Sequence, residues 1–365
     1  MKFKVEKANL IDGLQKVSSV IGTRTTLPIL SEVMVEAKDN SLVLTATDLE
    51  IRITMKIQAE VIEQGKTALP PKILLSIIRK LDDESIEMSL DDSHHLEFKS
   101  GASSYKILGM SPEDFPLPIE FSPVRSFTFK RNEVTRMLDR ISYASSTDDS
   151  RKTLNGILFA VKENAFTMVA TDGKRLALVE QVAENFSGED GQAIVPAKSA
   201  QEIQRIFAGS DEEMRIEFGE NQASFTSESI TLTTKLVEGN YPNYRQVIPT
   251  SFSRQVELPS SEFASAMQRI SFVVSETSAW VMLTFGNNEV KMKASSTEKG
   301  SGEESVKIEY DGPEMSASFN PAFLLAPFLH LDADKVTMQF NDGYNPVALS
   351  CGDGFLYVIM PMRSK

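Results

Sequence analysis

The sequence predicts an α+β fold made of three tandem copies of one domain, each with two helices packed on antiparallel sheets. One observation is that Ala46-Thr47-Asp48 recurs 124 residues later as Ala170-Thr171-Asp172, again beside alternating runs typical of strands. Another is that Pro70, Pro196 and Pro321, which precede helical patterns, are spaced by 126 and 125 residues. A period of about 120 residues is the size of an ordinary domain and is too long for a solenoid repeat.

The individual elements follow this period. Apolar residues at helical spacing occur in residues 8–21, 72–81, 132–142, a stretch introduced by Val195-Pro196, 261–272 and 323–329. Pro70-Pro71 suits the first turn of the second helix. Short alternating runs follow each helix, and Asp114 to Pro118 is typical of a linker. We therefore expect domains at residues 1–124, 125–250 and 251–365.

Each half of a domain has too few strands to form a closed sheet. Its sheet must continue into a neighbour or leave its edge strands exposed. We therefore expect sheets outside, helices inside and strand edges joined between domains. A closed ring removes the remaining edges, and one chain need not supply the whole ring.

Composition limits the class of protein. The single cysteine, Cys351, cannot form an internal disulfide, which favours a reducing compartment. We expect a cytoplasmic protein, because the alternating N-terminus lacks the apolar core of a signal peptide and no apolar run reaches about 18 residues. The net charge of −13 argues against wholesale coating by nucleic acid, although a local basic face remains compatible with it.

Five motifs spread over all three domains carry a resemblance. They are Thr26 to Leu30, Leu154-Asn155-Gly156, Ala170 to Ala177, Asn240 to Arg245 and Tyr357 to Arg363. Together they resemble the bacterial sliding clamp family, the beta subunits of DNA polymerase III, over the whole chain. The resemblance implies a non-catalytic processivity factor without cofactor or metal. It also implies a head-to-tail homodimer whose helices line a hole around double-stranded DNA, near the nucleoid.

The resemblance implies a set of DNA contacts. Lysine and arginine neutralise phosphates without reading bases, as a sliding protein requires. The alternative is an ordinary solvated helix face. The helix at 323–329 contains Pro327 and has neither lysine nor arginine, which makes it a weak candidate for the DNA face. The expected contacts are Arg24, Lys72, Arg151, Lys152 and Lys198.

The resemblance also implies a pocket for short peptides of the replicative polymerase alpha subunit, the clamp loader, other polymerases and repair proteins. Methionines adapt to several ligands, and Gly173 permits close approach to the backbone. Alternatively, Val358 and Met360 are ordinary strand-core residues. The expected lining is Leu154, Thr171, Gly173, Lys174, Arg175, Leu176, Pro242, Val247, Val347, Val358, Met360, Pro361 and Met362.

The dimer contact implied by the resemblance joins the first domain of one chain to the third domain of another. Charged residues from Glu298 to Glu304 flank it. The expected apolar contacts are Ile73, Ile77, Tyr105 and Ile107 on one side, and Phe272 and Val273 on the other.

Two other functions remain as alternatives. A carboxylate-dependent hydrolase or nuclease could use Asp48 and Asp172, but their equivalent positions in separate repeats favour a turn role. A scaffold that does not bind DNA is the other alternative. Gly65-Lys66-Thr67 resembles the end of a phosphate-binding loop but lacks the earlier glycine, so we expect a turn there. His94 and His95 are adjacent and would point to opposite faces of a strand, which makes them poor joint metal ligands.

Overall fold

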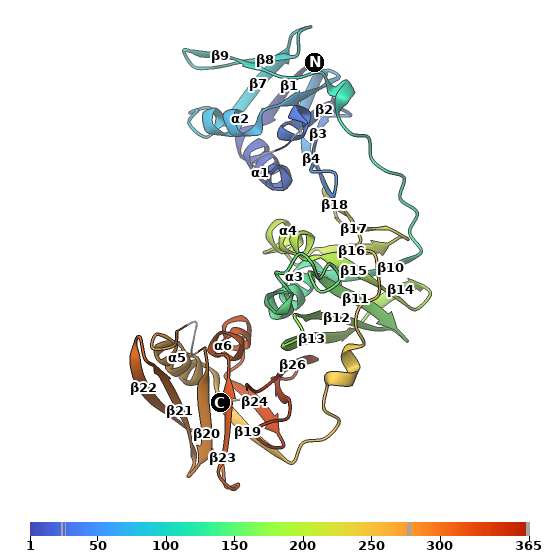
Figure 1. Ribbon diagram of the computed structural model, residues 1–365. Coiled ribbons are helices and arrows are strands. Elements are labelled where there is room, and N and C mark those ends of the chain that lie inside the picture. The colour runs from blue at the N-terminus through green and yellow to red at the C-terminus, as the bar shows by residue number, and fades with distance from the viewer. Residues whose placement is uncertain (23–24, 26, 276–278, 363–365) are drawn as a thin grey trace. The chain divides into compact units, whose positions relative to one another are not determined.

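The computed structural model describes residues 1–22, 25, 27–275 and 279–362, and these divide into two compact units. One unit comprises Met1–Val134, Glu184–Glu189 and Gln201–Leu236. The other comprises Thr135–Ala183, Asp190–Ala200 and Val237–Lys365, within the described limits. Figure 1 shows the elements of each. Residues of the middle repeat therefore belong to both units.

The first unit contains two antiparallel sheets. In spatial order, the five-stranded sheet consists of β5 (Glu60–Glu63), β1 (Lys2–Glu6), β7 (Ser85–Leu90), β8 (His95–Ser100) and β9 (Ser103–Leu108). The nine-stranded sheet consists of β14 (Glu184–Gly188), β10 (Arg125–Lys130), β16 (Glu213–Phe218), β17 (Gln222–Ser227), β18 (Ile230–Lys235), β4 (Ile51–Gln58), β3 (Ser41–Thr47), β2 (Val33–Lys38) and β6 (Gly65–Leu69). The expected turn at Gly65-Lys66-Thr67 was wrong, because these residues pair with β2.

The second unit also contains two antiparallel sheets. The eight-stranded sheet runs β15 (Gly191–Pro196), β11 (Gly156–Lys162), β12 (Ala165–Thr171), β13 (Arg175–Val182), β26 (Phe355–Ile359), β25 (Val347–Ser350), β24 (Lys335–Phe340) and β19 (Arg254–Pro259). The four-stranded sheet runs β22 (Gly300–Lys307), β21 (Glu289–Ser296), β20 (Val281–Gly286) and β23 (Met315–Phe319).

Two strand pairings join successive repeats. In the first unit β4 pairs with β18, and Arg52 lies opposite Thr233. In the second unit β13 pairs with β26, and Leu176 lies opposite Val358. The expectation that sheets continue between repeats is therefore confirmed for the nine- and eight-stranded sheets, where backbone hydrogen bonds hold the junctions, whereas the five- and four-stranded sheets each stay within one repeat.

The helices agree closely with the periodicity of the sequence. They are α1 (Lys7–Val17), α2 (Pro71–Ile78), α3 (Arg131–Ile141), α4 (Ala197–Phe207), α5 (Ser260–Ser271) and α6 (Pro321–His330). In the first unit α1 packs on α2 and β4, and in the second α5 packs on α6 and β22 (Figure 1). The rings of Phe263 and Phe328 lie 4.7 Å apart between α5 and α6. Each pair buries its apolar stripe against a sheet.

Candidate functional site

The turn between β12 and β13 is fixed by its own side chains. The Thr171 hydroxyl donates to the carbonyl oxygen of Arg175 over 2.5 Å, and Asp172 Oδ1 accepts from the backbone N–H of Lys174 and of Arg175. Gly173 has a φ of 85°, which other residues adopt only with strain. A short polar side chain bonding to the backbone two or three residues on is a strong turn former.

The equivalent turn in the first repeat has the same bonds. Thr47 donates to the carbonyl oxygen of Ile51 over 2.8 Å, and Asp48 Oδ1 accepts from the Ile51 N–H over 2.7 Å. Both aspartates thus stabilise hairpins, which supports the turn role over nuclease chemistry. Within the described ranges, no three His, Cys, Asp or Glu side chains gather as a metal-binding group.

A pocket of about 240 Å³ opens beside the Asp172 turn, between β13, β26 and the short helical turn η5 (Tyr244–Val247). Its floor rests on a buried apolar cluster that includes Leu176, Tyr241 and Val358. Val247 and Met360 leave about half of their side-chain surface exposed at the rim. The lining residues are Leu154, Thr171, Gly173, Lys174, Arg175, Leu176, Pro242, Asn243, Tyr244, Val247, Val358 and Met360.

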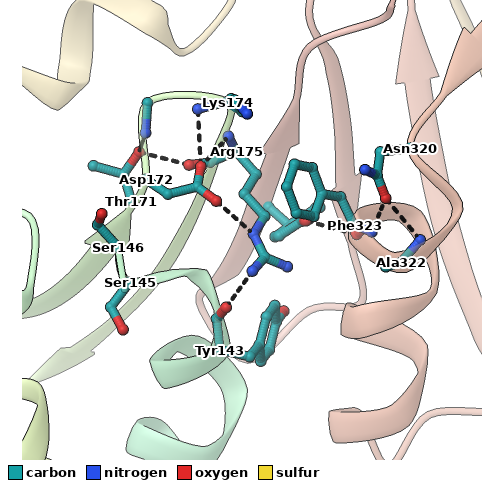
Figure 2. A network of polar contacts seen from close by, with 12 residues as sticks. Tyr143, Ser145, Ser146, Thr171, Asp172, Lys174, Arg175, Asn320, Ala322 and Phe323 are labelled. Atoms are coloured by element: carbon teal, nitrogen blue, oxygen red, sulfur yellow. Dashed lines mark hydrogen bonds and ion pairs between the residues drawn. The ribbon is translucent and has the colours of Figure 1, made fainter. Parts of the chain in front are cut away.

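Arg175 attaches the pocket turn to α6 and to η4 (Ser142–Ala144), the short helical turn that follows α3. Its Nε donates to Asp172 Oδ2 over 3.1 Å, and its terminal nitrogen donates to the backbone carbonyl of Tyr143. The guanidinium also lies beside the Phe323 ring (Figure 2), 4.3 Å from the centre of that ring. Charge-assisted bonds and stacking on an aromatic face are what a planar guanidinium provides and an ammonium does not.

A proline in α6 explains a further contact of this network. Pro327 has no N–H, so it cannot donate to the carbonyl of Phe323 four residues earlier. The Tyr357 hydroxyl donates to that carbonyl instead, over 2.7 Å. Burial raises the pKa of Tyr357 above its ordinary value and keeps the hydroxyl protonated. The break in the helix ladder thereby becomes an attachment point for β26.

Ten of the predicted pocket residues line this pocket and three do not. Val347 is buried within the sheet, where it pairs with Ile359. Pro361 and Met362 follow β26, and the Met362 N–H donates to the Ser318 carbonyl over 2.6 Å. The structure adds Asn243 and Tyr244. The sequence could have indicated both, because they belong to the same motif as Pro242, Asn240 to Arg245.

The predicted DNA-contacting residues are exposed wherever they are described. Arg24 lies outside the described residues. Lys72 and Lys198 each occupy the second position of a helix, α2 and α4, 126 residues apart in equivalent places of two repeats. Lys152 is exposed, whereas Arg151 donates to the Asp172 carbonyl over 3.1 Å and so also supports the pocket turn.

The predicted dimer residues differ in exposure. Phe272 is 78% exposed and Ile73 54% exposed, while Ile77, Tyr105 and Val273 are half-buried. Ile107 is only 5% exposed because its side chain lies on the buried face of its own sheet. Leu108, the next residue of β9, is 67% exposed. For a contact on the outer side of β9, Leu108 is therefore better placed than Ile107.

Comparison with known proteins covers the whole chain. Models of the N-terminal, central and C-terminal domains of the DNA polymerase III beta subunit match residues 1–119, 128–243 and 245–363. The beta sliding clamp of Chlamydia muridarum is 31% identical over 363 residues, covering 100% of this chain and 99% of the relative. That of Haemophilus influenzae is 31% identical over 371 residues, with full coverage of both.

Solved structures agree with the sequence comparison. A crystal structure of a Pseudomonas aeruginosa sliding clamp bound to griselimycin superposes with a TM-score of 0.95. The two chains are 29% identical, and each is covered over 100% of its length. Among the described residues of the present chain, the helices are too short or too polar to cross a membrane.

Proposed function

This chain belongs to the DNA polymerase III beta subunit family, the beta sliding clamps, and we propose that it acts as the processivity clamp of a replicative polymerase. It is a cytoplasmic, nucleoid-associated protein that catalyses no reaction itself. Two copies close head to tail around double-stranded DNA. The ring slides without sequence preference and tethers the polymerase alpha subunit, the clamp loader and repair proteins through the pocket beside Leu176.

The observation that carries ring closure is the position of two outer strands. β9 ends one sheet of the first repeat, and β22 ends one sheet of the third repeat. An outer strand presents unpaired backbone groups that can bond to another strand. Exposed Phe272 and Ile73 supply apolar surface on the two sides. A head-to-tail contact that closes after two copies forms a ring and removes both edges.

The position of Lys72 and Lys198 supports sequence-neutral DNA binding. A lysine in the first turn of a helix meets the positive end of the helix dipole, which is unfavourable for the isolated helix. A phosphate placed there would interact favourably with both the ammonium group and the positive end of the helix dipole. The bonds that result involve the DNA backbone alone and carry no base preference.

Replacing Lys72 and Lys198 together with alanine should weaken binding equally on duplexes of unrelated sequence. The slope of log affinity against log salt should fall by roughly 2 units, about 0.9 for each lost phosphate contact. Fluorescence titration across a salt series measures this slope. Lys335→Ala is the matched control, because Lys335 is exposed and pairs with Glu257. An unchanged slope in the double variant, or strong sequence preference in the wild type, would contradict the sliding contact.

Replacing Met360 with alanine should weaken binding of a labelled peptide that contains a glutamine and a pair of apolar residues. Met360 lies at the pocket rim, and its truncation removes apolar contact worth about 1–2 kcal/mol. Met362→Ala is the matched control, because Met362 is not among the residues that line this pocket. Its backbone N–H donates a hydrogen bond to the carbonyl of Ser318. Isothermal titration calorimetry measures the peptide affinity of both variants. A loss of affinity confined to Met362→Ala would contradict this assignment and place the peptide nearer the end of the chain.

A further inference from the structure

A second groove lies in the first unit, beside the linker that follows the first repeat. It has a volume of about 510 Å³ and is formed by the end of β3, the start of β4, the end of β18 and the segment from Pro116 to Phe121. Leu117 and Ile119 of that segment are 86% and 60% exposed. Side chains as apolar as these are seldom left together at the surface of a protein without a partner.

The repeat relates this groove to the pocket beside Leu176. Arg52 and Thr233 lie opposite each other across β4 and β18, as Leu176 and Val358 do across β13 and β26. The linker proline of the groove is Pro116, and that of the pocket is Pro242, 126 residues later. The same elements therefore build both depressions, one at each junction between repeats.

The chemistry of the two depressions differs at the equivalent positions. Arg52 replaces Leu176, Thr233 replaces Val358, and Lys235 replaces Met360. The groove thus keeps an apolar wall but exchanges its apolar floor for a polar and cationic one. A peptide selected by one depression is poorly matched to the other.

One of the two positive charges in the groove, that of Arg52, has no carboxylate partner among the described residues. Lys235 is paired with Glu50 over 3.2 Å, so these two charges offset each other. The Arg52 guanidinium donates to the carbonyl of Pro116 and lies over the Phe115 ring, and no carboxylate of the described residues pairs with it. Partial burial lowers the pKa of Arg52, which is the signature of a cation with part of its hydration removed. An incoming carboxylate would supply the missing charge.

We propose that this groove is a second docking site, for a linear peptide that places a carboxylate against Arg52 and an adjacent apolar side chain against Leu117 and Ile119. The apolar wall favours a peptide over the phosphates of a nucleic acid. The site depends neither on ring closure nor on occupancy of the pocket beside Leu176. The clamp thereby offers two classes of peptide site at different junctions between repeats. The pocket beside Leu176 takes apolar side chains on its floor, and the groove beside Arg52 takes a carboxylate there.

The test uses two fluorescein-labelled peptides, Gly-Ser-Asp-Leu-Val-Gly-Ser and the same peptide with asparagine for aspartate, titrated against the full-length protein. Fluorescence polarisation should show saturable binding of the aspartate peptide. The asparagine peptide should bind about tenfold more weakly, because it lacks the charge-assisted bond. Arg52→Gln should reduce affinity for the aspartate peptide by a similar factor. Leu117→Ser, which alters an exposed side chain and leaves the fold intact, should reduce it about fivefold.

Met360→Ala is the control that separates the two sites, because it changes the other pocket alone. Binding of the aspartate peptide should be the same for Met360→Ala and wild type. The proposal is overturned if the wild type does not bind that peptide, if both peptides bind equally, or if Leu117→Ser has no effect. Loss of binding in Met360→Ala would also overturn it, by placing the peptide in the pocket beside Leu176.

Discussion

Replacing Phe272 with aspartate should convert the dimer into monomers and release the protein from circular DNA. Phe272 is exposed in the single chain, and burial of its ring at a contact between chains would contribute about 3 kcal/mol. A two-chain ring contains two identical contacts, so the change acts twice. The combined loss of roughly 6 kcal/mol corresponds to about a ten-thousandfold weaker dimer, before the cost of burying an unpaired carboxylate is counted.

Sedimentation at micromolar concentration measures the mass, for which wild type should give about twice 40.4 kDa. Val182→Asp is the matched control, because Val182 is an equally exposed apolar residue on β13. Retention on a loaded circular plasmid should be lost in Phe272→Asp and kept in the control. Linearising the plasmid should release the wild type too. A Phe272→Asp protein of unchanged mass would remove this residue from the interface.

Replacing Arg175 with alanine should destabilise the second unit and abolish peptide binding at the pocket beside Leu176. The side chain of Arg175 is largely buried, and its removal leaves Asp172 Oδ2 and the Tyr143 carbonyl without their donor. Loss of bonds to a charged group and of stacking on Phe323 should lower the free energy of unfolding by about 2–3 kcal/mol. The pocket turn loses its attachment to α6 at the same time.

Thermal denaturation followed by circular dichroism measures the stability change. Arg175→Lys should regain little of the stability lost in Arg175→Ala. An ammonium group cannot both donate to Asp172 and the Tyr143 carbonyl and stack flat on the Phe323 ring. Lys174→Ala is the neighbouring control, since Lys174 is exposed and should leave the unfolding temperature nearly unchanged. Equal stability of Arg175→Ala and Lys174→Ala would show that the network has no role in holding the turn.

Local chemistry explains which features could be predicted from the sequence. The hairpins at Asp48 and Asp172 are specified by residues within a few positions of each other, and their recurrence identified the repeat. Helix positions were recovered because apolar spacing and first-turn prolines are also local signals. The resemblance then supplied Leu176 and Val358 as residues of one pocket, which spacing alone would not have done, and the structure shows them opposite each other across β13 and β26.

The features that could not be predicted depend on contacts between distant segments. Met362 was expected in the pocket, but its N–H bonds to Ser318 on another strand. Ile107 and Tyr105 share one face by alternation, and sequence cannot say that this face is turned inward. The bond from the Tyr357 hydroxyl to the Phe323 carbonyl could not be predicted either, because the N–H that Pro327 lacks in one segment is replaced by a hydroxyl from another.

The strand pairings that join successive repeats determine where the ring should come apart. β4 with β18, and β13 with β26, are continuous ladders in which the pairing spans five residues on each side. Their amide protons should exchange with deuterium only on global unfolding. β9 and β22 each pair with a neighbouring strand on one side only, so their outward-facing amides would gain protection from the proposed contact between chains. Opening to admit DNA should therefore accelerate exchange at the outer edges of β9 and β22 before it reaches the pairings between repeats, so that the contact between chains serves as the gate.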